Sequence, residues 1–287
     1  LGFSRALGLD IEQWMKEDLI DIWIATGYFR LQEWKQTVAL GHKHGAQVWA
    51  SIDESRIVGR DGRNSVEVYR GRIMNAWNAD VDAIWLFNFF YRPNEPQFAL
   101  LQEAGDSNTL ALKDKIYVAD ARGRSGAGRY LKNGDRFFTR PRTFSPAQPA
   151  TLKPNESETI ALAVGDDVAS AEAKGYTAQV TLRIQASPGS GRHDLIVRFN
   201  DQVLRNERHD GKWVEYGLLP ASVRKGPNRV VISHGLGAQR NPVLRDLQLS
   251  IRYAPSGDVN SGETTRSSAA RKQRVELTIE FDEGAGK

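Results

Sequence analysis

Three short apolar segments, each with a tryptophan at its second or third position, constrain the fold of this chain most. They are residues 21–28, 47–54 and 83–90, and each follows a helix-like stretch. Near-continuous apolar runs of this length are typical of buried parallel strands, because other elements cover both faces of such strands. Aligning Trp23, Trp49 and Trp85 predicts that the three segments end at one rim. Alternating strands and helices place ligand sites at the carboxyl ends of the strands.

Helical patterns separate these segments. Asp10 is a predicted N-cap, with Gln13 completing a capping box. A second helix is predicted from about Leu31, with Gly45 where a C-cap glycine belongs, and a third from near Asn64. The order strand–helix–strand–helix–strand is the rhythm of a (β/α) barrel, although a doubly wound sheet would show it too.

The pattern changes from about Thr143, where the helical period disappears and short alternating segments begin. Turn residues separate these segments, notably Asn200-Asp201 and Gly226-Pro227-Asn228. Period-two alternation with such turns is typical of a β-sandwich. The predicted strands are residues 159–164, 178–184, 194–199, 229–233 and 247–253.

We therefore expect an α/β plus all-β chain in three parts. Residues 1–120 form a partial (β/α) TIM-type barrel, residues 121–145 a basic linker, and residues 146–287 a β-sandwich accessory domain. Within the last part, residues 254–274 are rich in Ser, Gly and Arg and are expected to be mobile, and residues 275–281 alternate again like a strand.

The composition of the chain limits which classes of binding partner are expected. The chain has 287 residues, 40% hydrophobic and 26% charged, with a net charge of +4, which is the profile of a globular protein with room for two domains. The basic run at residues 122–142 could bind nucleic acid, but its glycines and prolines favour a solvated connector, so we expect no nucleic-acid partner. A nucleic-acid site there would lose affinity steeply with salt.

Absent residue types and segments exclude further classes. The chain has no cysteine, which rules out disulfides, thiol nucleophiles and zinc–thiolate sites. No run reaches the roughly 20 apolar residues that span a bilayer, so no membrane partner is expected. The chain begins Leu1-Gly2 without an initiator Met or a signal-peptide pattern, and we expect it to start inside a longer polypeptide or after processing.

Several short segments of the sequence resemble those of a known protein family. In the first part they are residues 7–14, 40–49, 69–77 leading to 84–89, 101–106 and 113–117; in the second, residues 197–204 and 225–231. The first part resembles the C-terminal half of the TIM barrel in glycosyl-hydrolase-like proteins of environmental bacteria, and the second resembles the jelly-roll module that often follows. The resemblance implies a carbohydrate substrate or ligand and a periplasmic or extracellular location.

The same resemblance implies that the first strands of the barrel are missing from this chain. A half barrel leaves two open sheet edges and an uncovered apolar interior. Such a chain must form a homo-oligomer, meet the missing N-terminal half of the barrel as another chain, or be a fragment.

Carboxylates follow only one of the three strands. Glycoside hydrolysis generally uses two carboxyl groups, about 5 Å apart for retention and roughly 6.5–9.5 Å apart for inversion. Alternation assigns Val48, Ala50 and Ile52 to the helix-facing layer and turns Asp53 inward. Asp53 is therefore the first candidate for acid, base or nucleophile, and Glu54 the second. The alternatives are that Asp53 caps the next loop and that Glu54 pairs with Arg56.

Residues near the other strand ends could bind a sugar. Asn88 could hydrogen-bond a hydroxyl group, and Arg92 could hold the carboxylate of a uronic acid. Tyr28, Phe90 and Tyr91 could form an aromatic platform for a sugar face, although the sequence favours plain packing between strand ends and loops for them. Trp23, Trp49 and Trp85, lower on the strands, are predicted to pack in the core.

No metal or cofactor is expected. His42 and His44 are two residues apart on a helix and so point to different faces. Residues 125–128 are glycine-rich but lack the context of a phosphate loop. The leading hypothesis is a glycoside hydrolase with carboxylate acid/base chemistry, and the alternative is a non-catalytic glycan-binding or scaffold protein.

Overall fold

The computed structural model describes residues 1–25, 31–53, 63–119, 127–139, 143–146, 148–186, 194–235, 238 and 240–256, with only the backbone of Asp53. Residues 1–256 make one compact unit. Within the described residues, no helix is both long and apolar enough to cross a membrane.

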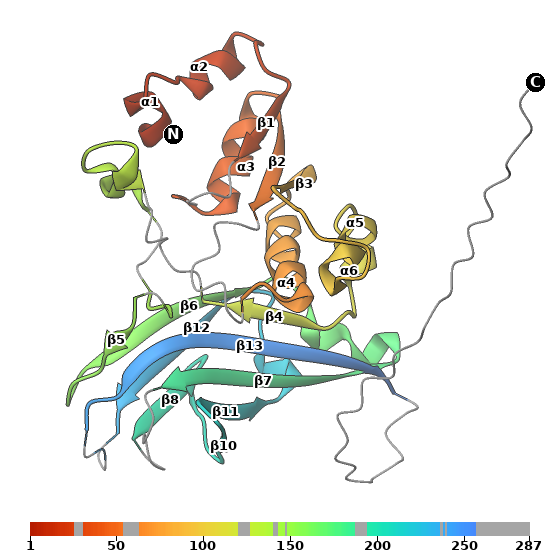
Figure 1. Ribbon diagram of the computed structural model, residues 1–287. Coiled ribbons are helices and arrows are strands. Elements are labelled where there is room, and N and C mark those ends of the chain that lie inside the picture. The colour runs from red at the N-terminus through yellow and green to blue at the C-terminus, as the bar shows by residue number, and fades with distance from the viewer. Residues whose placement is uncertain are drawn as a thin grey trace, which may run out of the picture. The chain divides into compact units, whose positions relative to one another are not determined.

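The three tryptophan-bearing segments form a parallel sheet, which confirms the central expectation from the sequence (Figure 1). Its strands are β1 (Ile22–Ala25), β2 (Gln47–Asp53) and β3 (Ala83–Phe87), in that spatial order. The tryptophans themselves are not level, because Trp49 lies opposite Ile24 and Trp85 lies opposite Ser51. Among the described residues this sheet has three strands and does not close into a barrel.

The helices before and between these strands begin and end where local chemistry predicts. The Asp10 carboxylate accepts a hydrogen bond from the Gln13 N–H at 3.2 Å at the start of α2 (Ile11–Lys16). Gly45, with φ +77°, follows α3 (Trp34–Lys43). Ser65 caps α4 (Val66–Trp77) through the Val68 N–H. The remaining helical elements are α1 (Gly2–Ala6), α5 (Leu100–Glu103), α6 (Ser107–Leu110) and the 3₁₀ helices η1 (Pro96–Ala99), η2 (Ala127–Arg129), η3 (Gly134–Phe137), η4 (Val168–Ser170), η5 (Glu172–Lys174) and η6 (Pro220–Ser222).

One face of the parallel sheet is buried and the other is open. Val48, Ala50 and Ile52 are buried against residues of α3 and α4, as the alternation predicted. On the opposite face the Trp49 and Trp85 rings lie 6.2 Å apart, and Trp85 is 41% exposed. The prediction that Trp85 packs in the core is therefore wrong for this chain, because none of the described elements covers that face of β3 at Trp85.

The second half of the chain forms two antiparallel sheets. The larger sheet has the order β10 (Arg208–Asp210), β11 (Trp213–Leu218), β7 (Tyr176–Ala186), β13 (Val243–Pro255), β4 (Lys115–Val118), and β5 (Ala150–Thr151) also pairs with β13. The smaller sheet has the order β6 (Ser157–Val164), β12 (Gly226–His234), β8 (Leu195–Phe199), β9 (Gln202–Val203). Both sheets contribute to one apolar core, which includes Leu182, Leu249, Ile160 and Val230. The expected α/β plus all-β chain is thus confirmed.

All five predicted sandwich strands exist, as β6, β7, β8, β12 and β13. Asn200 (φ 47°) and Asp201 (φ 71°) make the hairpin turn between β8 and β9. The predicted turn at residues 226–228 is wrong, because these residues begin β12 and pair with residues 162–164 of β6. Residues 254 and 255 end β13 rather than beginning a mobile segment, and the rest of the predicted tail lies outside the described residues.

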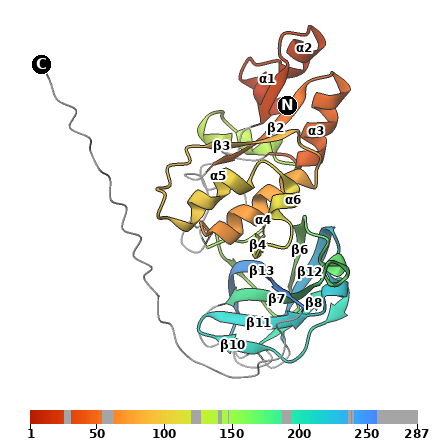
Figure 2. The same ribbon diagram turned by 90° about the vertical axis from the view of Figure 1, so that its right-hand side faces the viewer.

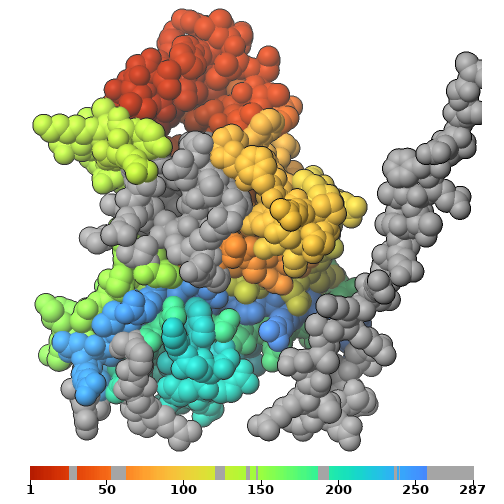
Figure 3. Space-filling model, in the orientation of Figure 1, coloured from red at the N-terminus to blue at the C-terminus, as the bar shows by residue number. Residues whose placement is uncertain are grey.

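Strand β4 joins the two halves of the chain. It belongs to the part expected to be barrel, yet it pairs with β13. Helix α4 packs on β4 (Figure 2), and Gly71 allows this approach because a Cβ there would lie 2.5 Å from the Ile116 carbonyl oxygen. A Cβ at Gly165 would likewise meet the Met74 carbonyl oxygen at 2.5 Å. The orange and yellow residues of α4–α6 meet the sandwich without a gap in the space-filling view (Figure 3).

A buried ion pair also crosses this junction. Arg63, which precedes α4, donates to both carboxylate oxygens of Asp246 on β13, with Nε 3.3 Å from Oδ2. The Leu247 N–H and the Gln248 amide donate to the same carboxylate. A buried charge needs this degree of compensation, so the pair fixes the end of the loop after β2 against the sandwich.

Candidate functional site

The carboxyl ends of β2 and β3 meet at one edge of the parallel sheet. Asp53, the last residue of β2, lies opposite Phe87, the last residue of β3, and Asn88 follows directly. The backbones of Asp53 and Asn88 are therefore one residue out of register at a shared rim. The Asp53 side chain and residues Tyr28 and Glu54 lie outside the described part of the chain, so their predicted roles stay predictions.

Asn88 turns the chain at the end of β3. Its φ of 51° lies in the left-handed region, which asparagine tolerates better than most residues. The side chain is half-buried, and it makes no hydrogen bond to any described residue. Its amide is therefore free to bind a hydroxyl group, although the turn alone would also explain an asparagine here.

The aromatic residues after Asn88 separate into packed and exposed ones. Phe89 and Tyr91 pack edge-on against the buried Tyr69, at ring distances of 5.8 and 6.0 Å. Tyr91 also brings its hydroxyl to 3.4 Å from that of Tyr69. Phe90 points away and is 83% exposed. Of the two described platform candidates, Phe90 offers an open ring face, whereas Tyr91 mainly fills the junction between β3 and α4.

Arg92 begins a turn beside this cluster. Its backbone N–H donates to Glu95 Oε2 at 2.6 Å, and its carbonyl accepts the Glu95 N–H at 2.9 Å. The guanidinium is exposed and makes no ion pair with a described carboxylate. Arg92, four residues after Asn88 in the sequence, is therefore available to an acidic ligand.

His42 in α3 and His44, which directly follows α3, lie near different carboxylates. His42 Nε2 lies 2.9 Å from Asp82 Oδ2, whereas His44 Nε2 lies 3.6 Å from Glu12. Burial raises the pKa of Asp82, but hydrogen bonds from the Val48 N–H and from His42 outweigh this and leave the pKa below its usual value. Among the residues that the structure describes, no group of three or more His, Asp or Glu side chains could hold a metal ion.

A second polar cluster, which our sequence analysis did not identify, lies where α4 and α6 meet the sandwich. Lys115 on β4 is completely buried, and its ammonium lies 3.1 Å from Oδ2 of Asp166, which is 5% exposed. The Tyr253 hydroxyl donates to the same oxygen at 3.2 Å. The Asp166 N–H donates to the Tyr117 hydroxyl at 3.1 Å. We name these four residues the junction cluster.

Burial governs the protonation of the junction cluster. It lowers the pKa of Lys115, and Asp166 opposes this shift. It raises the pKa of Asp166, opposed by Lys115 and by both tyrosine hydroxyls. It also raises the pKa of Tyr253 and Tyr117. The lysine ammonium keeps three acceptors, since the Leu110 and Lys113 carbonyls complete its shell.

A signal for this cluster exists in the sequence. A lysine within the apolar run Lys115–Val118 and an acidic residue just past the alternating segment 159–164 are both unusual for buried positions. The fold pairs these two residues across 51 residues of chain, and this pairing offsets the free-energy cost of burying either charge.

Comparison with models of protein families and with curated protein sequences found no match. Among solved structures, the chain is similar to a β-porphyranase of glycoside hydrolase family 86 from the human gut bacterium Bacteroides plebeius. The identity is 10% and the TM-score 0.29, over 49% of this chain and 21% of that one. The chain thus spans about a fifth of that structure's length.

Proposed function

We propose that this chain is a carbohydrate-active protein whose sugar cleft lies at the carboxyl edge of β1–β3. The observation that carries the proposal is the parallel pairing of β2 with β3, which ends both strands at Asp53 and Phe87. Ligand sites of parallel α/β sheets lie at this edge. The free amide of Asn88, the exposed ring of Phe90 and the exposed guanidinium of Arg92 supply hydrogen-bonding, stacking and charged groups of the kinds that sugars bind.

Hydrolysis would use the carboxyl group of Asp53 or Glu54 together with a partner carboxylate from the chain that completes the barrel. One, as a general acid, protonates the glycosidic oxygen while the bond to the anomeric carbon breaks. The other either activates a water molecule or attacks the anomeric carbon itself, depending on the separation of the two groups. Asn88 and Tyr28 would orient the sugar ring in this scheme.

The test is the release of reducing ends from a panel of polysaccharides by the wild type and by Asp53→Asn and Glu54→Gln. Loss of an acid or base group should reduce turnover by roughly 10²–10⁴-fold. Asp210→Asn is the matched control, because Asp210 is exposed on β10 of the sandwich. Unchanged turnover in Asp53→Asn would remove that residue from the mechanism.

A non-catalytic glycan-binding protein is the second candidate. Of the three strand ends at the edge, only that of β2 carries carboxylates, since β1 is followed by Thr26-Gly27 and β3 by Asn88-Phe89. A site that only holds sugar needs no carboxyl pair. Binding on a glycan array without product release, retained in Asp53→Asn, would favour this candidate over the hydrolase.

The open face of β1–β3 supports a further part of the proposal, that the sheet is a portion of a TIM-type barrel completed by another chain. Ile22, Ile24 and Trp85 are each at least 40% exposed on this face, and parallel sheets are normally covered on both sides. The completing chain is proposed to carry the N-terminal βα units. Within the same proposal, the sandwich is a jelly-roll-like accessory module and the protein acts in the periplasm or outside the cell.

A further inference from the structure

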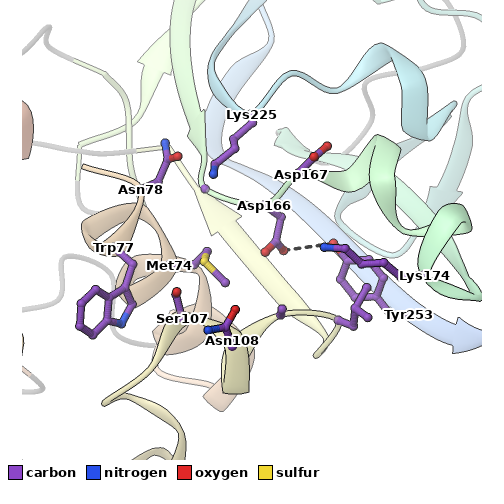
Figure 4. A pocket seen from close by; sticks show the side chains of 13 residues that line it. Met74, Trp77, Asn78, Ser107, Asn108, Asp166, Asp167, Lys174, Lys225 and Tyr253 are labelled. Atoms are coloured by element: carbon purple, nitrogen blue, oxygen red, sulfur yellow. Dashed lines mark hydrogen bonds between the residues drawn. The ribbon is translucent and has the colours of Figure 1, made fainter. Parts of the chain in front are cut away.

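A pocket of about 180 Å³ lies against the junction cluster. Its walls come from the end of α4, from α6 and the residues after it, from the loop after β6, and from the 3₁₀ helix η5 and strand β13 (Figure 4). This volume is room for several waters, or for a molecule the size of one sugar ring.

The carboxylate at the bottom of the pocket already has its interaction partners within the protein. Asp166 lines the pocket, but its carboxylate is held by Lys115 and by the Tyr253 hydroxyl. Lys115 neutralises the Asp166 carboxylate, and Tyr253 donates a hydrogen bond to it, so Asp166 does not need a ligand. This floor positions the groups that line the pocket above it.

The walls, in contrast, carry polar groups that have no partner among the described residues. Lys174 and Lys225 are exposed, and neither forms an ion pair with a described carboxylate. Figure 4 shows them on different sides of the pocket. The side chains of Asn78, Ser107 and Asn108 also line the pocket and make no hydrogen bond to a described residue. The pocket therefore offers two ammonium groups, two amides and a hydroxyl to a ligand.

The charges of the site favour a single negative charge on that ligand. Two lysines and two aspartates line the pocket, but Lys115, which lies outside the lining, already pairs with Asp166. Lys174 and Lys225 therefore stand against Asp167 alone, which leaves a net charge of +1. The amides and the hydroxyl can both donate and accept hydrogen bonds, which suits neighbouring hydroxyl groups better than it suits a bare inorganic anion. Tyr253 and Trp77 add aromatic surface to the lining.

We propose that this pocket binds a hexuronate, a sugar ring bearing one carboxylate, with Lys174 and Lys225 attracting the carboxylate and Asn78, Ser107 and Asn108 binding hydroxyl groups. The site is separate from the strand-end edge and has no catalytic role. It goes beyond the proposed function, and it stands whether or not Asp53 takes part in hydrolysis.

The experiment measures binding of D-glucuronate to the full chain by NMR titration or calorimetry, with D-glucose and inorganic phosphate in parallel. We expect a Kd on the order of 1 mM for glucuronate, with weaker binding of both comparison ligands. Lys174→Ala and Lys225→Ala should each weaken glucuronate binding by about five- to tenfold, equivalent to roughly 1–1.4 kcal/mol. Asn108→Ala should weaken glucose and glucuronate alike.

Lys212→Ala is the matched control, because Lys212 is an exposed lysine in the turn before β11 and lies outside the pocket. All three lysines are exposed, so the variants should fold as the wild type does. Absence of glucuronate binding, phosphate binding as tight as glucuronate, or an equal effect of Lys212→Ala would each overturn the proposal. Lys174→Ala and Lys225→Ala should leave the release of reducing ends from polysaccharides unchanged, which separates failure of this site from failure of the proposed function.

Discussion

The β-sandwich and the parallel sheet bury their apolar residues in different ways. The sandwich packs the inner faces of two sheets against each other, and its core residues Leu182, Ile184, Leu249 and Ile251 are fully buried. The parallel sheet packs one face on α3 and α4 and leaves Trp85 exposed on the other. The sandwich can thus account for its own stability, whereas the parallel sheet depends on the elements that touch it. Three pairs of substitutions test this difference.

The largest effect is expected where the two regions are joined, at Arg63 and Asp246. Arg63→Met leaves the Asp246 carboxylate buried without its cation, which should lower the free energy of unfolding by about 3–5 kcal/mol. Denaturant unfolding monitored by tryptophan fluorescence measures this change.

The exposed pair Arg229–Asp201 provides the control for Arg63→Met. Its side chains are 57% and 73% exposed, and exposed pairs contribute roughly 0–1 kcal/mol. Arg229→Met should therefore be nearly silent. If Arg63→Met were equally silent, the buried pair would not be what holds the loop after β2 to the sandwich.

The next effect contrasts the two apolar cores directly. Leu182→Ala removes a fully buried side chain from the sandwich and should cost about 2–5 kcal/mol. Trp85→Ala removes a larger side chain from the open face and should cost less than about 1 kcal/mol, because surface substitutions rarely cost more. Thermal and denaturant unfolding of the two variants give the comparison. A cost for Trp85→Ala as large as that for Leu182→Ala would mean that the face is covered in solution.

The smallest effect concerns a matched carboxylate in each region. Glu103 in the α/β part accepts from Arg70 and Lys113, and Glu215 in the sandwich accepts from Arg183 and Arg208, all at 2.7–3.0 Å. Burial raises the pKa of each carboxylate, but these cations outweigh it and hold both pKa values below the usual 4.5. Each group therefore stabilises the fold above pH 4.5, and this stabilisation is lost as the pH falls through the lowered pKa.

Glu103→Gln and Glu215→Gln should each cost on the order of 1 kcal/mol at pH 7 and should flatten the acid limb of the stability curve. Unfolding free energies measured from pH 7 down to pH 3 report this slope. A slope that stays as steep as in the wild type in either variant would show that the carboxylate contributes nothing to acid unfolding there.

Local sequence patterns predicted the strands and helices of this fold better than they predicted which elements pack or pair with one another. Apolar runs identified β1–β3, and alternation identified five sandwich strands, because burial of one or both faces imposes these periods. The pattern missed β4 and β11. Lys115, a charged residue, begins the four-residue strand β4 and leaves only three residues after it, and Glu215 and Gly217 interrupt β11. Both charges are buried only because partners distant in sequence neutralise them.

The candidate site was predictable to a similar extent. The shared rim of Asp53 and Asn88 followed from parallel strands, which periodicity indicates. The sequence favoured packing for Tyr91 but could not identify its neighbour, because that neighbour, Tyr69, lies on α4 rather than on the strand that precedes Tyr91. The junction cluster was likewise out of reach, since Lys115 and Asp166 approach only when β4 joins the sandwich sheet.

Strand β4 has a practical consequence for anyone who divides this chain. Because residues 115–118 lie before the expected linker yet occupy an edge of the larger sheet beside β13, a piece cut after that linker would lose its border strand. The backbone groups of β13 that now bond to β4 would face water, ready to recruit a strand from a neighbouring molecule. A fragment that contains the complete larger sheet therefore has to start upstream of Lys115. Such a fragment also keeps the lysine that neutralises the buried Asp166.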